Sequence, residues 1–334
     1  MKRSRPRAED FTVGWLCALP VERAAAELML DDEYDEGWRN SPYTLGRIDK
    51  HNVVIACLPA GLIGTNSAAV VATKMQSDFR SIRIRLMVGI GGGVPSAESD
   101  VRLGDVVISQ PHMGRGGVVQ YDFGKTGVGG KLKLDGFLNA PPTFLLDALA
   151  KLRANEIRGK SKLSTCLSTF DQQPNFTRQR AGPDVLFQPN YNHTEGATCE
   201  QCCKDMEVKR PLRKDQNPVI HYGTIASGNQ VIKDGKTRDA RSSALGGVLC
   251  FEMEAAGLMN NFPCLVIRGI CDYADSHKNK AWQPYAAATA AACAKEILSL
   301  VPAADNADKH RLGIPFSALP SPVPQAYVQH LTNF

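Results

Sequence analysis

Short apolar runs alternate with helix-like amphipathic patterns along most of this chain. Seven apolar runs have the length and composition of buried strands, at residues 12–19, 52–58, 84–90, 105–109, 162–168, 219–227 and 263–271. Helical patterns lie between them, at 20–30, 64–79, 142–155, 252–261 and 280–300. This alternation predicts an α/β domain with three layers, in which helices flank a central mixed sheet.

Three regions depart from the alternation and set the expected boundaries. Residues 170–218 are polar and rich in Pro, Asn and Gln, so they are predicted to form an insertion. Residues 302–334 contain prolines and little periodicity, which is typical of a tail or a linker. Residues 1–10 begin with a basic arm that is expected to be disordered. The folded domain is therefore expected to span residues 11–301.

Composition narrows the class of protein further. The 334 residues carry a net charge of only +5, and no long Lys/Arg run is interleaved with aromatic residues, so a nucleic-acid partner is not expected. No apolar stretch approaches the ~18 residues of a membrane helix, and the N-terminus lacks the apolar core of a secretory signal. Most of the ten cysteines lie in apolar contexts typical of reduced, buried thiols. These features predict a cytoplasmic enzyme without a membrane partner.

A glycine cluster follows the apolar run 84–90. Gly91 and Gly92 lie in it, and glycines at the end of a strand let a ligand approach the backbone closely. A plain tight turn is the alternative interpretation. The cluster lacks the spacing of a dinucleotide-binding loop and the Gly-Lys-Ser/Thr ending of a phosphate-binding loop.

Acidic residues follow two of the predicted strands. Asp272 comes directly after the run 263–271, and Glu22 lies just past the run 12–19. In open α/β sheets, ligands bind beyond the carboxyl ends of the strands, which favours a functional role for both acids. Glu252 and Glu254 begin a predicted helix, where acids also occur simply because they complement the helix dipole.

These segments together resemble the purine-nucleoside phosphorylase / methylthioadenosine nucleosidase superfamily over residues 11–301. The segments that carry the resemblance are ALPVE (18–22), GIGGG (89–93), LGDVVIS (103–109), ASGNQVIKD (226–234), FEMEAAG (251–257) and VIRGICD (266–272). The pattern is most similar to the fungal branch, often found as the N-terminal module of NACHT or ankyrin-repeat proteins. The resemblance implies a nucleoside-phosphorylase-like fold and a homodimer or higher homo-oligomer.

The resemblance also implies roles for individual residues. Glu254 matches the Glu that binds the ribose 2′- and 3′-hydroxyls, with Met253 under the sugar and Glu252 in support. Asp272 matches the Asp that protonates N7 of the leaving purine, and burial against its strand is expected to favour the protonated form. Glu22 matches the Glu that activates water in the nucleosidases.

The same resemblance assigns a loop to the base. Val231 and Ile232 fall where the family's backbone meets the purine, and Ser227 and Asn229 belong to that loop. The nucleosidases usually have Asp at the position of Asn229, so the surroundings of the acid differ here. Gln230 has no Arg at the spacing that uridine phosphorylases use, which favours a purine.

The attacking group distinguishes hydrolysis from phosphorolysis. Met87 and Ile90 stand where the phosphorylases have phosphate-binding residues, and Glu22 would repel a phosphate dianion. Arg23 lies nearby and keeps phosphorolysis open. The predicted function is a purine nucleosidase that hydrolyses the N-glycosidic bond of an adenosine-like ribonucleoside to free base and ribose, without a cofactor. A phosphate-dependent phosphorylase, a methylthioadenosine/adenosylhomocysteine nucleosidase and a non-catalytic nucleoside sensor are the alternatives.

The predicted insertion contains a compact group of metal-ligand residues. His193, Cys199, Cys202 and Cys203 have spacings compatible with zinc. A single Cys-x-x-Cys without a second pair is a weak signal that is more typical of free thiols in a loop, and no metal is expected in the nucleoside site itself. Another interpretation of the insertion is a lid over the base, formed by Asp184, Phe187 and Tyr191.

Overall fold

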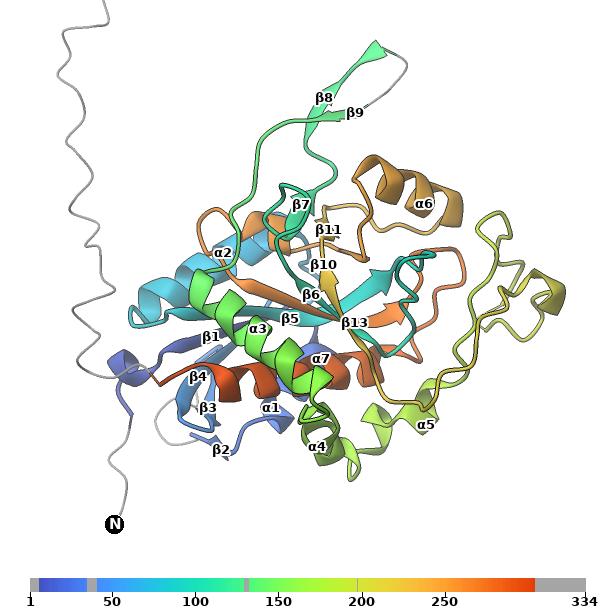
Figure 1. Cartoon of the computed structure of the whole chain (residues 1–334). Helices are drawn as coiled ribbons and strands as arrows, with labels where there is room; N and C mark the ends of the chain where they lie inside the picture. The colour runs from blue at the N-terminus through green and yellow to red at the C-terminus, as the bar shows by residue number, and fades with distance from the viewer. Residues whose placement is uncertain (1–5, 35–40, 129–131, 197, 304–334) are drawn as a thin grey trace, which may run out of the picture. The chain divides into compact units, whose positions relative to one another are not determined.

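A mixed sheet forms the centre of the protein in a computed structural model that describes residues 6–34, 41–128, 132–196 and 198–303 (Figure 1). Its main path runs in the order β10 (Ile220–Gly223), β6 (Val106–Ser109), β13 (Leu265–Asp272), β5 (Ile84–Gly93), β1 (Val13–Cys17), β4 (His51–Cys57), β3 (Thr44–Ile48) and β2 (Asp32–Glu33). β13, β5, β1 and β4 run parallel, so their carboxyl ends meet at one edge.

The remaining strand pairs make the sheet mixed. β6 is antiparallel to β13, and β3 is antiparallel to both β4 and β2. A branch is formed by β7 (Val118–Gln120), β11 (Ile225–Ser227) and β12 (Cys250–Glu252), with β12 antiparallel to the end of β5. A separate hairpin, β8 (Gly124–Thr126) and β9 (Leu132–Leu134), projects from the body in Figure 1.

Helices cover both faces of the sheet, which confirms the predicted three-layer α/β architecture. One face packs on α1 (Pro20–Leu28), α3 (Thr143–Ile157), α4 (Leu163–Leu167) and α7 (Gln283–Leu300), and the other packs on α2 (Thr65–Asp78) (Figure 1). The period of two along β1 explains this division: Trp15 faces the α1/α7 core, whereas Leu16 faces the α2 core. Both side chains are fully buried.

The alanine-rich sequence of α7 has a packing role. A Cβ atom on Gly269 of β13 would overlap the backbone of Ala286, so the helix lies directly against the strand. Small residues on both elements allow this approach, which bulky side chains would prevent. The helix α7 thereby supports β13, the strand that ends in Asp272.

Three local predictions were wrong. Residues 162–168 contain the short helix α4 rather than a strand, because Leu163 and Leu167 are four residues apart and pack on one helical side. Residues 252–261 contain the end of β12 and a 3-10 turn, η6 (Ala255–Gly257), rather than a regular helix. The helix α6 (Gly235–Ala244) was missed, although Asp234 caps it by accepting the Thr237 N–H.

The ends of the chain are described in part. The described residues up to Val301 form one compact unit, and of the residues after it only Pro302 and Ala303 belong to the described ranges. In the predicted basic arm, η1 (Ala8–Asp10) is a short 3-10 turn, and residues 1–5 lie outside the described ranges. Within the described part of the chain, no helix is long and apolar enough to cross a membrane.

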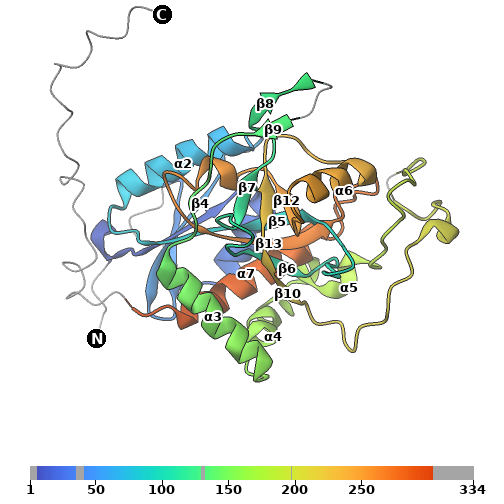
Figure 2. The same cartoon turned by 45° about the horizontal axis from the view of Figure 1, so that its top comes forward.

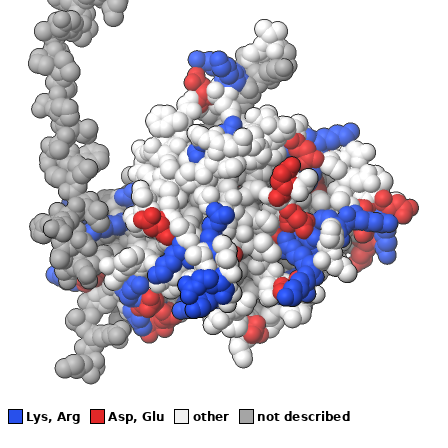
Figure 3. Space-filling view, in the orientation of Figure 1, with Lys and Arg blue, Asp and Glu red and all other residues white. Residues whose placement is uncertain are grey.

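The predicted insertion, 170–218, runs along one side of the domain with little regular structure (yellow-green in Figure 2). Its helical parts are short: the end of η3 (Ser168–Phe170), η4 (Pro174–Phe176), α5 (Arg178–Ala181) and η5 (Lys204–Met206). Ion pairs fasten it to the body, since Arg213 contacts the buried Asp105 at 2.6 Å. On the face in Figure 3, basic and acidic side chains lie intermixed.

Candidate active site

A cavity of about 270 Å³ lies at the carboxyl ends of β1, β5 and β13. Residues from six separate segments of the chain meet in its wall. Nine of the residues predicted from the sequence line it: Glu22, Gly91, Gly92, Val231, Ile232, Glu252, Met253, Glu254 and Asp272. Acids that are up to 250 positions apart in the sequence, Glu22 and Asp272, are therefore brought to one place.

Ser227 and Asn229 are not among the described residues that line this cavity. The buried Ser227 hydroxyl accepts the Ala256 N–H at 2.8 Å and so holds the turn after β12. The Asn229 side chain accepts hydrogen bonds from the backbone N–H and the hydroxyl of Thr65, at 3.0 and 3.1 Å. Asn229 thereby links the 229–232 loop to the start of α2.

Glu22 is buried in the first turn of α1. One carboxylate oxygen accepts the N–H groups of Ala18 and Leu19 at 2.7 and 2.9 Å, and the other accepts the Ile90 N–H at 2.8 Å. These donors fix the carboxylate against the end of β5. Burial raises the pKa of Glu22, and the Arg268 guanidinium and the three backbone donors oppose this rise.

Arg268 is a cation that lies among three acids. Its side chain projects from β13, is 1% exposed, and forms ion pairs with Glu252, with Glu254 at 3.3 Å and with Glu22 at 4.0 Å. It also donates a hydrogen bond to the Ile90 carbonyl at 3.2 Å. The neighbouring carboxylates outweigh burial and raise the pKa of Arg268 further. One positive charge thus holds three carboxylates together.

Glu252 and Glu254 have different surroundings. Glu252 accepts the N–H groups of Glu254 and Ala255, which ties it into its own turn. Glu254 accepts the Gly64 N–H at 3.2 Å and lines the cavity. Burial raises the pKa of Glu254 to about 7, while Arg268 acts in the opposite direction. Glu254 is therefore a carboxylate whose charge can change near neutral pH.

Asp272 is the last residue of β13 and lies in the cavity wall. Its Oδ1 accepts the Ala274 N–H at 2.8 Å and lies 3.0 Å from the Lys278 ammonium group. Its Oδ2 faces the Cys271 thiol at 3.2 Å. The carboxyl group is half-buried and held on two sides, with Lys278 beside it in the cavity wall.

The glycines of β5 make room for these charged groups. A Cβ atom on Gly89 would collide with both Glu22 and Arg268, and a Cβ atom on Gly92 would lie 2.7 Å from Asp272 Oδ1. Gly91 to Gly93 belong to the strand itself rather than to a turn after it. The glycines of β5 therefore let neighbouring side chains lie close to the strand, and they would let a ligand do the same.

Apolar residues stand at the two positions where the phosphorylases have phosphate-binding residues. Met87 is fully buried in the core, and Ile90 lines the cavity with an apolar side chain. Arg23 pairs with Glu27 at 2.8 Å and donates to the Thr44 hydroxyl at 2.7 Å. It is not among the described residues of the cavity wall.

Two cations of the cavity were missed by the sequence analysis. Arg268 stands within an otherwise apolar strand, four residues before Asp272, and a lone charge in a buried strand was the available signal. Lys278 lies in an irregular loop, where no periodicity indicates its direction. Both are ion-paired with carboxylates that were predicted to be functional.

A second cavity of about 510 Å³ adjoins the first, and Cys271 and Asp272 line both. Its other wall comes from the insertion, including Cys199 and Cys202. None of the three residues considered as a lid is among the described residues that line the first cavity, although Phe187 lines the second. Asp184 accepts a hydrogen bond from Tyr273, and Phe187 stacks on His277 with ring centroids 4.1 Å apart. Tyr191 lies beside the same imidazole.

The described residues match the phosphorylase superfamily over residues 12–299, and this chain belongs to that family. The match covers the whole sheet and every residue of the cavity described above. The predicted resemblance is confirmed at the level of the superfamily.

Curated relatives give a finer comparison. A nucleotide-binding leucine-rich repeat (NLR)-like protein of Hyaloscypha variabilis is 48% identical over 90% of this chain, which spans only 30% of that protein's length. A 5′-methylthioadenosine/S-adenosylhomocysteine nucleosidase of Mycobacterium bovis is 25% identical, over 87% of this chain and 97% of its own. An ATP nucleosidase, Cap17, of Escherichia coli is 26% identical, over 83% of this chain and 48% of its own.

A solved structure shows the same fold. The 5′-methylthioadenosine/S-adenosylhomocysteine nucleosidase of S. pneumoniae with a transition-state inhibitor superposes with a TM-score of 0.55. It is 20% identical and covers 87% of this chain and 100% of its own. The mixed sheet with flanking helices is thus shared with a nucleosidase.

Proposed function

We propose that this domain hydrolyses the N-glycosidic bond of a purine ribonucleoside, giving free base and ribose. The observation that carries the proposal is the convergence of Glu22, Glu254 and Asp272 on one cavity at the carboxyl ends of the parallel strands. Cleavage of this bond needs three things: protonation of the base, hydrogen bonds that hold the sugar, and activation of a water molecule. Each acid has the surroundings to supply one of them.

Asp272 supplies the proton to N7 of the leaving purine. As the bond breaks, electron density moves to the base, and a proton at N7 neutralises it. Lys278 lies 3.0 Å from the carboxylate, so its ammonium group can give a proton to Asp272, which passes it to N7 and leaves Lys278 as the neutral amine. Val231 and Ile232 line the same cavity and are suited to contact the base.

Glu254 holds the sugar and Glu22 directs the water. The Glu254 carboxylate can accept hydrogen bonds from the ribose 2′- and 3′-hydroxyls, while Met253 packs under the ring. Glu22 lines the cavity and is held by three backbone donors, which leaves acceptor capacity on one carboxylate oxygen for a water molecule. A carboxylate in that position accepts a proton from the attacking water.

Phosphorolysis is less well supported by the cavity wall. A phosphate dianion needs unpaired cations or several N–H donors. Arg268 and Lys278 are already paired with carboxylates, and Arg23 pairs with Glu27 away from the wall. Ile90 is apolar, and its N–H is bound to Glu22.

The substrate is proposed to be an adenosine derivative. The names of the relatives refer to methylthioadenosine, adenosylhomocysteine and ATP, which share adenine and ribose and differ at the 5′ position. The NLR-like relative is much longer than this chain and supports a second proposal, in which the domain senses a nucleoside for an attached switch.

Chromatography of reaction mixtures tests both proposals. The protein is incubated with adenosine, inosine, 5′-methylthioadenosine and ATP, and the free base is quantified. We expect adenine from at least one adenosine derivative, and a rate lower by on the order of 10²–10⁴ from a Glu22→Gln control. Saturable binding of a nucleoside without release of any base would overturn the enzyme and support the sensor.

A further inference from the structure

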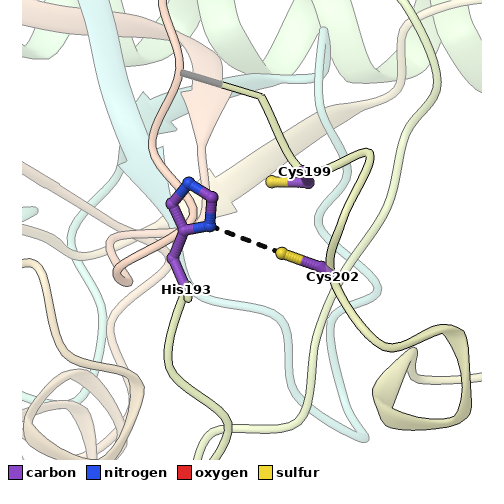
Figure 4. A group of neighbouring side chains, drawn as sticks. All are labelled: His193, Cys199 and Cys202. Atoms are coloured by element: carbon purple, nitrogen blue, oxygen red, sulfur yellow. Dashed lines mark hydrogen bonds between the residues drawn. The ribbon is translucent and has the colours of Figure 1, made fainter. Parts of the chain in front are cut away.

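His193, Cys199 and Cys202 form a compact group at the inner side of the insertion (Figure 4). Their ligand atoms all lie within 4.8 Å of one another, and His193 Nδ1 is 3.4 Å from Cys202 Sγ. Cys202 is buried, and the other two are half-buried. Cys203, which the sequence pattern also offered, is exposed and is not part of this group.

The protonation of His193 is set by its second ring nitrogen. Nε2 lies 3.0 Å from the Gly196 carbonyl oxygen, which can only accept a hydrogen bond. Nε2 therefore carries the hydrogen, and the lone pair of Nδ1 points toward Cys202. A metal-binding histidine usually donates its other N–H to a carbonyl or carboxylate in this way.

We propose that His193, Cys199 and Cys202 bind a zinc ion that fastens the insertion to the body of the domain. Tetrahedral zinc with Zn–S near 2.3 Å and Zn–N near 2.0–2.1 Å places sulfur and nitrogen about 3.6 Å apart. The observed Nδ1–Sγ separation of 3.4 Å is close to this. Two thiolates and an imidazole form a donor set that selects zinc over magnesium or calcium.

His277 lies beside the group but outside the set of ligand atoms that are within 4.8 Å of one another, so its ring would have to move to supply a fourth ligand. Its ring centroid lies 5.7 Å from that of His193, and its carbonyl oxygen lies 3.9 Å from Cys199 Sγ. Among the described residues, neither buried ring nitrogen of His277 has a hydrogen-bond partner. Nδ1 lies 3.7 Å from an Asp275 carboxylate oxygen, which is an ion-pair distance and too long for a hydrogen bond.

The position of the group indicates a structural role. The backbone N–H of His193 donates a hydrogen bond to the Ser276 hydroxyl at 2.9 Å. The group therefore lies against the loop that follows β13. Cys199 and Cys202 line the cavity that also contains Asp272. An ion here would stabilise the wall beside the candidate active site without contact to the reacting atoms.

Metal analysis tests the proposal directly. The wild-type chain is purified under reducing conditions, reloaded with Zn²⁺ or Co²⁺ after chelation, and desalted. We expect about one ion per chain, with a thiolate-to-cobalt charge-transfer band in the near ultraviolet. Cys202→Ser and His193→Ala should lose the bound ion and, in the cobalt form, this band.

Cys203→Ser is the matched control, because Cys203 is adjacent in sequence but exposed. It should keep the full metal content. Circular dichroism establishes whether each variant is folded, and the wild-type chelation and reloading cycle does not depend on any variant. Wild-type protein without stoichiometric zinc after reloading would overturn the proposal, as would equal loss of metal in Cys203→Ser. Eight rather than ten titratable thiols in chelated, denatured protein that was purified without reductant would instead indicate a Cys199–Cys202 disulfide and also overturn it.

Discussion

Arg268 forms a fully buried ion pair with Glu252, and each side chain is only 1% exposed. The same guanidinium lies near Glu254 and Glu22, so three carboxylates share one cation. Buried charges of this kind are costly to leave unpaired. The site therefore depends on Arg268 for its structure. Burial raises the pKa values of Glu22 and Glu254, and the Arg268 guanidinium opposes both rises.

Replacing Arg268 by Met should destabilise the domain strongly. Removal of the cation leaves up to three buried carboxylates without compensation, and breaking a buried pair costs about 3–5 kcal/mol. Urea unfolding measures the change in the free energy of unfolding. Arg23→Met is the control, because Arg23 is about one third exposed and pairs with Glu27 near the surface; such pairs contribute about 0–1 kcal/mol. Similar losses in both variants would contradict the role assigned to Arg268.

The pKa of Glu254, about 7, predicts a pH dependence of activity. Only the carboxylate can accept hydrogen bonds from both ribose hydroxyls, so kcat/KM should rise as pH increases through about 7. Glu254→Gln should lower kcat/KM and remove this rise. Initial rates between about pH 5 and about pH 9 measure the profile. An unchanged profile in the variant would assign the titration to another group.

The same shift predicts the sign of a stability change. The pKa of Glu254 is about 7 in the folded protein and 4.5 in the reference state, so between these values the folded protein binds more protons than the unfolded chain. The free energy of unfolding should therefore be highest below pH 4.5 with respect to this group, and fall as pH rises to about 7. Glu22 acts in the same direction, so Glu254→Gln should reduce this fall without abolishing it.

Asp272→Asn should keep the fold and remove most activity toward natural purine nucleosides. The amide retains an oxygen for the Ala274 N–H but cannot deliver a proton to N7. We expect a decrease in kcat on the order of the 10²–10⁴ typical of a lost general acid. A riboside with a 4-nitrophenolate leaving group needs less protonation and should lose less. Equal losses on both substrates would mean that Asp272 has a structural role.

The sequence predicted the central strands of the sheet and most of the cavity because both depend on local patterns. The runs 84–90 and 263–271 are apolar at most of their buried positions, with Arg268 as the exception, and Asp272 directly follows the second run. Nine predicted residues meet in the cavity for that reason. The helix predicted at 252–261 was wrong because Cys250 and Phe251 pair with Gly93 and Gly92, a long-range contact that local periodicity does not contain.

The partners of the acids could not be predicted from spacing. Lys278 reaches Asp272 from an irregular loop, and Asn229 turns toward Thr65 rather than into the cavity wall. Both directions depend on how loops pack after folding. The contact between His193 and Cys202 likewise depends on the path of the insertion, which the sequence pattern does not contain.

The strongest prediction concerns Glu22 and phosphate. The wild-type protein should release free base and free ribose at a rate that does not rise when phosphate is added. Glu22 is fixed by Ala18, Leu19 and Ile90, so its charge opposes an anion in the place where water would attack. Glu22→Gln should reduce kcat by on the order of 10²–10⁴, as for a lost general base, with a smaller change in KM. Coupled assays for ribose and for ribose 1-phosphate, with and without phosphate, distinguish the two reactions. Ribose 1-phosphate as the main product would show that a cation of the site, such as Lys278, leaves its carboxylate partner to bind phosphate, and the domain would then be a phosphorylase.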